Sequence, residues 1–183
     1  MELTKNLTQA KLFKSLVVIV LGSIALTISA KIKIPFYPVP MTMQTFVVLF
    51  LGISLGHKIA LATIGLYLIE GIVGLPVFSN SPERGIGLVY FIGPTMGYLI
   101  GFLSACIIAS LIKEKDNYLL IFSKLIFSVS TIYFFGVLWL GTLIGWDKPI
   151  FELGVLPFLP AEILKVSLLI LLAKKLIKLR KFI

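Results

Sequence analysis

The 183-residue sequence is poor in the residues that build disulfides, metal sites and most catalytic centres. It has one cysteine, Cys106, in an apolar segment, and one histidine, His57, in a short polar turn. A single cysteine cannot form an intramolecular disulfide, and no residues have the spacing of a metal site. Phosphate-binding loops, dinucleotide-binding glycine patterns and nucleophile elbows are also absent. The sequence therefore predicts no enzyme, no ATPase, and no metal or cofactor bound by the chain itself.

Charged residues are scarce as well. They make up 14% of the chain, hydrophobic residues make up 58%, and the mean hydropathy is +1.07. A soluble domain is nearer half apolar and a quarter charged, so the composition predicts an all-α integral membrane protein. The net charge of +9 does not indicate a nucleic-acid partner. Basic residues gather at the ends of apolar segments and in the tail after residue 173, a pattern typical of contact with an anionic lipid leaflet.

Six apolar segments are separated by turns or polar stretches. A membrane span needs about 20 apolar residues, and the chain has room for six spans and short loops. We expect a single membrane domain over residues 1–183, a bundle of six transmembrane helices, with spans at approximately 12–30, 42–55, 58–74, 94–112, 118–144 and 159–179.

The distribution of lysine and arginine predicts which side of the membrane each end occupies. Six spans put both termini on one side. If that side is the cytoplasm, its share of the 17 basic residues is twelve: Lys5, Lys11, Lys14, Lys58, Lys113, Lys115, Lys124, Lys174, Lys175, Lys178, Arg180 and Lys181. The other five are Lys31, Lys33, Arg84, Lys148 and Lys165. Because loops rich in lysine and arginine stay inside, we expect both termini to be cytoplasmic.

Glu162 and Lys165 are the most informative charged residues, since they lie in the first turns of the last apolar segment. Ionisable residues at membrane depth are costly and mark functional sites, and a spacing of three places both on one helix face. A structural salt bridge is the alternative reading. The predicted topology also places Gln44, Asn80 and Arg84 on the outer side. The sequence therefore predicts a polar ligand site there.

Two connections on that outer side are rich in proline and glycine. Residues 31–40 hold three prolines and should form a stiff, extended segment. In the second connection, residues 75–87 are the longest polar stretch and lead on to Thr95, and long loops tend to carry function. Tyr90 and Phe91 in the second connection, with Phe36 in the first, are candidates to wall the apolar part of a ligand.

Small residues line the outer half of the first span, among them Gly22, Ala25 and Ser29. Small residues four apart allow a second helix to approach closely. Packing inside the chain's own bundle and contact with another protein are both consistent with this pattern.

Four motifs then resemble those of the BioY family, the biotin-specific substrate-binding (S) components of energy-coupling factor (ECF) transporters. They are Pro-Val-Pro-Met-Thr-Met-Gln-Thr at 38–45, Gly-Leu-Pro-Val-Phe at 74–78, Gly-Pro-Thr-Met-Gly-Tyr-Leu-Ile-Gly-Phe at 93–102, and Gly-Val-Leu-Pro-Phe-Leu-Pro at 154–160 followed by Glu162 and Lys165. Glu162 stands where the family usually has aspartate, and Ala161 replaces a glycine.

The resemblance implies high-affinity biotin binding in a cavity open to the outside of a bacterial plasma membrane. It implies three partner subunits besides biotin and the bilayer: a coupling membrane subunit and two ATPases, which use the ATP. In this reading Glu162, Lys165, Arg84, Asn80 and Gln44 face the vitamin, and Gly22, Ala25 and Ser29 face the coupling subunit. An S component for thiamine or riboflavin, a biotin carrier that needs no ATPases, and a scaffold without a ligand remain as alternatives.

Overall fold

The computed structural model describes the backbone of residues 2–182 and the side chains of residues 9 and 11–182. Its α-helices are α1 (Glu2–Lys31), α2 (Gln44–Ile72), α3 (Leu88–Phe91), α4 (Met96–Ser110), α5 (Tyr118–Ile144), α6 (Ile150–Gly154) and α7 (Leu159–Lys178). Two short 3-10 helices, η1 (Leu156–Phe158) and η2 (Leu179–Phe182), flank α7. The strands β1 (Lys33–Ile34) and β2 (Met41–Thr42) form an antiparallel pair.

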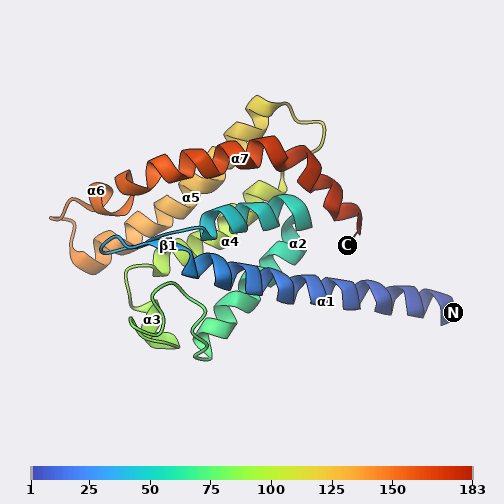
Figure 1. The fold of residues 1–183 in the computed structure, drawn as a ribbon, viewed down its shortest axis with the longest axis horizontal. Coiled ribbons are helices and arrows are strands. Elements are labelled where there is room, and N and C mark those ends of the chain that lie inside the picture. The colour runs from blue at the N-terminus through green and yellow to red at the C-terminus, as the bar shows by residue number, and fades with distance from the viewer. Residues whose placement is uncertain (1, 183) are drawn as a thin grey trace.

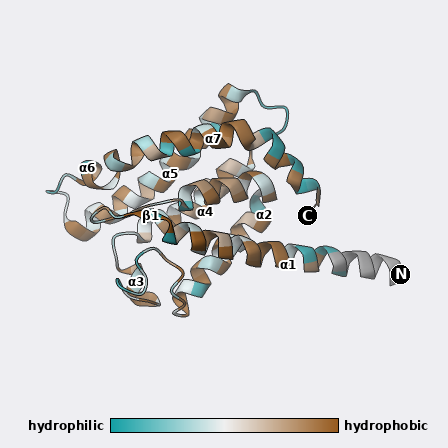
Figure 2. Cartoon of the chain, in the orientation of Figure 1, coloured by the Kyte–Doolittle hydropathy of each residue, from teal (hydrophilic) through white to brown (hydrophobic). Residues whose placement is uncertain are grey.

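Four helices in the described part of the chain are long and apolar enough to cross a membrane: Lys11–Lys31, Gln44–Ile72, Tyr118–Ile144 and Ile150–Phe182. The shorter α4 is also apolar. Figure 2 shows hydrophobic residues along these helices and hydrophilic ones near the C-terminus and in the loops. The predicted class, an all-helical membrane protein, is confirmed.

Helix α2 is bent rather than straight. Gly56 has φ 76° and ψ 170°, so the helix is interrupted there, and Figure 1 shows its two parts running in different directions. A positive φ is costly for residues with a Cβ and easy for glycine. The two parts of α2 correspond to the second and third predicted spans, and the other four predicted spans fall on α1, α4, α5 and α7.

Glycines let the central helices approach one another closely. A Cβ on Gly101 of α4 would lie 2.6 Å from the Ile132 Cα of α5, and one on Gly97 would lie 2.2 Å from the Phe135 carbonyl oxygen. Gly52 of α2 meets the Cys106 carbonyl of α4 in the same way. This close packing of α2, α4 and α5 forms the centre of the bundle.

The loops named as functional in the sequence lie together at one end of the bundle. In Figure 1 the β hairpin, α3 and α6 lie toward the left, whereas both chain ends lie toward the right. The backbone N–H of Met43 donates to the carbonyls of Ser29 and Ile32, which fixes the hairpin to the end of α1. Lys31 donates to the carbonyls of Phe78 and Ser81, both at 2.9 Å. The end of α1 therefore holds both connections in place.

Arg180 fastens the end of the chain to the bend in α2. Its Nε donates to the carbonyl of Ile53 at 2.7 Å and its Nη2 to that of Gly52 at 3.3 Å. These carbonyls lie in the last turn before the Gly56 break, where helical donors are missing. A cation at a helix C-terminus also interacts favourably with the helix dipole.

We predict that Arg180→Ala lowers the melting temperature of the detergent-solubilised chain. The variant loses a charged donor to two carbonyls, which should reduce the free energy of unfolding by about 1–2 kcal/mol. The matched control is Lys178→Ala. The Lys178 side chain is exposed and its ammonium lies 3.7 Å from Glu114, and such surface pairs contribute little. Equal melting temperatures for the two variants would contradict the assignment.

Candidate functional site

Glu162 and Lys165 lie in the first two turns of α7, and both are buried, with 5% and 7% of their surface exposed. The helix begins after Pro157 and has Pro160 in its first turn, where a missing N–H costs nothing. The carboxylate therefore lies near the positive end of the helix dipole, which stabilises its charge. The two side chains form a salt bridge of 2.7 Å between Nζ and Oε1.

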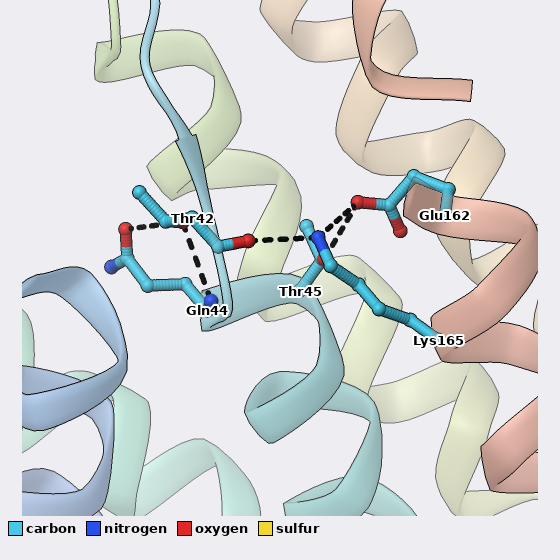
Figure 3. Close-up of polar contacts among 5 residues, drawn as sticks. All are labelled: Thr42, Gln44, Thr45, Glu162 and Lys165. Carbon is cyan, nitrogen blue, oxygen red and sulfur yellow. Dashed lines mark hydrogen bonds and ion pairs between the residues drawn. The ribbon is translucent and has the colours of Figure 1, made fainter. Parts of the chain in front are cut away.

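A threonine in the first turn of α2 completes this pair. The Thr45 hydroxyl donates to Glu162 Oε1 at 2.8 Å and accepts from Lys165 Nζ at 3.0 Å. Lys165 also donates to the Thr42 carbonyl at 2.7 Å. Figure 3 shows the chain crossing from β2 into α2 beside the start of α7, with Lys165 between the two. The three contacts join segments that lie more than 100 residues apart in sequence.

The network satisfies the lysine but not the carboxylate. An ammonium has three donors, and all three are used, toward Thr42, Thr45 and Glu162. Glu162 Oε2 is buried and has no hydrogen-bond partner. A buried charged oxygen without a donor is costly. The site therefore offers one strong acceptor to a ligand, while Lys165 positions that acceptor.

Glu162 opens onto a cavity between α2, α4, α5, η1 and the two connections. Its walls are Val39, Pro40, Met41, Thr42, Gln44, Thr45, Ser79, Tyr90, Thr95, Tyr98, Leu99, Phe102, Ile132, Tyr133, Phe158 and Glu162. The cavity volume is about 50 Å³, within an empty space of about 550 Å³ that includes the open mouth. The cavity is thus narrow, and a larger ligand has to displace side chains or a loop.

Two of the predicted site residues, Gln44 and Tyr90, line the cavity and form hydrogen bonds with other parts of the protein. Gln44 lines the cavity, and its amide donates to the Tyr67 hydroxyl at 2.8 Å, while its Oε1 accepts from Thr42 at 3.1 Å. The Tyr90 hydroxyl donates to the carbonyl of Ser79 at 2.6 Å. Burial raises the pKa of Tyr90, so this phenol stays a neutral donor. The neighbouring Ser79 hydroxyl faces the cavity region, buried and without a partner.

Asn80 and Arg84 lie beside the cavity rather than in its wall. They line a small adjoining hollow that shares Tyr90 and Thr95 with the cavity. Arg84 donates to the Pro38 carbonyl at 2.6 Å, and Asn80 accepts from Lys33. Both contacts connect residues 75–95 to residues 31–40. The structure therefore brings the two connections together over one end of the cavity.

The two remaining aromatic candidates lie behind the wall. Phe91 packs edge-on against Phe78, with ring centroids 5.4 Å apart. Phe36 contacts the cavity residue Phe158 edge-on at 6.1 Å, and 39% of its own surface is exposed. The aromatic wall itself consists of Tyr90, Tyr98, Phe102, Tyr133 and Phe158. Tyr133 carries no sequence signal, because it lies within a mostly apolar helix and outside the four motifs.

Two of the three residues expected at a coupling surface lie inside the bundle. A Cβ on Gly22 would lie 2.6 Å from Thr63 of α2, and Ser29 is 3% exposed. Packing within the chain therefore accounts for these two, whereas Ala25 is half-buried. The outward face of α1 carries the larger Leu21, Ile24 and Ile28. Facing inward, Ser23 donates to Glu70 of α2, which explains that acidic residue.

The family model described as "BioY family" matches residues 3–182. The chain belongs to the BioY family. A "Probable biotin transporter BioY" of Pyrococcus horikoshii is 38% identical over 154 residues, 84% of this chain and 90% of that protein. A "Biotin transporter BioY" of Thermotoga maritima is 32% identical over 176 residues, 96% of this chain and 97% of that protein.

A solved structure shares the fold. The S-component for biotin from an ECF-type ABC transporter superposes with a TM-score of 0.76 at 24% identity, covering 92% of this chain and 93% of that one. The resemblance recognised in the four motifs is thus confirmed, and with it the prediction that this BioY protein is not an enzyme.

We predict that Thr45→Val, which removes the hydroxyl and keeps the shape, destabilises the protein by roughly 1–3 kcal/mol, because it leaves Glu162 and Lys165 each short of a buried partner. Thr142→Val is the matched control, since that hydroxyl is exposed and bonds only to the Trp139 carbonyl. The melting temperatures of the two variants in detergent check this. If Thr45→Val has the same melting temperature as Thr142→Val, the Thr45 hydroxyl does not stabilise the Glu162–Lys165 pair.

Proposed function

We propose that this chain is the high-affinity biotin-binding subunit of an ATP-driven ECF vitamin transporter. The observation that carries the proposal is the buried, unpartnered Oε2 of Glu162, a residue in the wall of a cavity that is rich in aromatic side chains. Biotin presents two ureido N–H donors on an apolar ring system. An N–H of this group supplies the donor that the carboxylate lacks, in a setting where charge-assisted hydrogen bonds are strong.

The charge distribution supports one orientation of the vitamin. The carboxylate of biotin would be repelled by Glu162, whereas Arg84 and Asn80 line the adjoining hollow, which shares Tyr90 and Thr95 with the cavity. We therefore place the ureido ring at Glu162 and the carboxylate toward Arg84. Since the cavity is narrow, the proposal requires residues 75–95 or nearby side chains to move when the vitamin enters.

Glu162→Gln should weaken biotin binding at least about tenfold, because the amide puts a donor where the ureido group needs an acceptor. Titration calorimetry of the purified chain measures this, with thiamine and riboflavin as alternative ligands. Glu152→Gln is the control, as Glu152 is exposed on α6. Unchanged affinity in Glu162→Gln would place the ureido group elsewhere, and tighter binding of thiamine or riboflavin would make this an S component for another vitamin.

Arg84→Gln tests the orientation separately. The natural chain should bind biotin more tightly than biotin methyl ester, because only the free acid forms a charged pair with Arg84. The variant should lose most of this preference while retaining its affinity for the ester. Replacement of Lys148, an exposed cation away from the cavity, should leave the preference unchanged. A preference for the free acid that survives in Arg84→Gln would contradict the proposed orientation.

The proposal extends to topology and partners. We infer six membrane crossings with both termini in the cytoplasm of a bacterial cell, which is supported by the two parts of α2 and by both ends lying at one end of the bundle. The cavity would then open outward. A coupling membrane protein and two ATPases would supply the energy, with Ala25 and the outward face of α1 as the contact surface. Biotin uptake by cells with and without these partners separates this proposal from a self-sufficient carrier.

A further inference from the structure

A second, larger hollow lies between α5 and α7, on the outside of the bundle. Its volume is about 780 Å³, and its lining is almost wholly apolar. The lining includes Phe122, Ile126, Phe134, Leu138, Ile163 and Val166. We call it the α5–α7 groove. It exists because α5 packs mainly on α4 and only slightly on α7, which leaves the facing surfaces of α5 and α7 apart.

The position of the groove identifies its occupant. Both α5 and α7 belong to the helices that can cross a membrane. From Phe122 to Leu138 the groove follows sixteen residues of helix, about 24 Å, most of the roughly 30 Å hydrocarbon core. Trp146, which also lines it, is a residue type enriched where headgroups meet hydrocarbon. The groove therefore faces acyl chains along its length, and Trp146 at one end is a residue suited to the level of the lipid headgroups.

The floor of the groove is the wall of the ligand cavity. Tyr133 and Glu162 line both spaces, so these side chains separate the cavity from the surface that faces lipid. Glu162 is 5% exposed, and its Oε2 accepts no hydrogen bond of normal geometry in the protein. An open groove would admit water behind this carboxylate. A hydrocarbon chain in the groove would keep water out and hold Tyr133 and Glu162 against the cavity.

We propose that the α5–α7 groove binds one acyl chain of a membrane phospholipid and that this chain seals the Tyr133–Glu162 wall. Binding of the chain is a property of the groove alone. Its effect on the vitamin rests on the proposed biotin site, so the two parts are tested by separate measurements.

Tryptophan fluorescence tests the lipid. The chain has two tryptophans, so Trp139→Phe leaves Trp146, inside the groove, as the only reporter. Titration of this variant in detergent with dibrominated phosphatidylcholine should quench Trp146 along a curve that saturates near one phospholipid per protein. Adding Ser167→Phe, which fills the groove from α7, should reduce the quenching to the level of random encounter within the micelle.

Ser123→Phe is the matched control, since Ser123 is exposed on α5 outside the groove. In the Trp139→Phe background it should leave the saturable quenching intact. Quenching that rises linearly, and equally in all three variants, would overturn the acyl-chain site. A melting temperature measured for each variant shows that the groove-filling phenylalanine is tolerated.

Biotin dissociation tests the seal. In the natural chain, removal of phospholipid should speed biotin release several-fold, and its return should restore the slow rate. With Ser167→Phe the rate should no longer respond to phospholipid. Saturable quenching with a lipid-independent rate would uphold the groove and overturn the seal. Absence of biotin binding in every variant would instead refute the proposed vitamin site, leaving the quenching result unaffected.

Discussion

The buried ion pair of Glu162 and Lys165 is the interaction on which the arrangement around the cavity depends. Burying two charges costs several kcal/mol each, which their attraction offsets only when the remaining donors and acceptors are satisfied. Lys165 meets that condition through Thr42 and Thr45. Lys165 can reach Thr42 and Thr45 only if β2 runs into α2 directly beside the start of α7. The pair therefore fixes the relative position of two helix N-termini, and it leaves one carboxylate oxygen for a ligand.

Local sequence explains why both helices start at this point. Pro38 and Pro40 precede β2, and Pro157 and Pro160 surround the start of α7, so regular helix cannot extend backward from either start. Thr45 and Glu162 consequently lie in the first turns of α2 and α7, at the positive ends of two helix dipoles. A buried negative charge is favoured there. The prolines thus set the position of the helix ends, and the helix ends make the carboxylate tolerable.

Hydropathy and spacing were sufficient to predict the helices and the Glu162–Lys165 pair, because apolar runs and intramembrane charges are local signals. Other features depended on tertiary contacts. Tyr133 lines the cavity in the region where Gly97 and Gly101 let α4 pack closely against α5. Gly22 and Ser29 face the inside of the bundle because α2 packs against α1. Small residues permit such packing but do not specify which helix is the partner. The contacts by which Arg84 and Asn80 connect two loops, with Pro38 and Lys33, also carry no local sequence signal.

Because the cavity is narrow, a ligand can enter only if one side of the cavity opens. The free-energy cost of displacing each side decides which one opens. On one side, residues 75–95 are held to residues 31–40 by Arg84, and to α1 by Lys31. Such hydrogen bonds near solvent contribute about 1 kcal/mol each and are replaced by water when they break. On the other side stands the Tyr133–Glu162 wall, and displacing it would expose a carboxylate to hydrocarbon, which is far more costly. The relative costs therefore favour entry of the proposed ligand beneath the 75–95 connection, with the wall facing α5 and α7 closed.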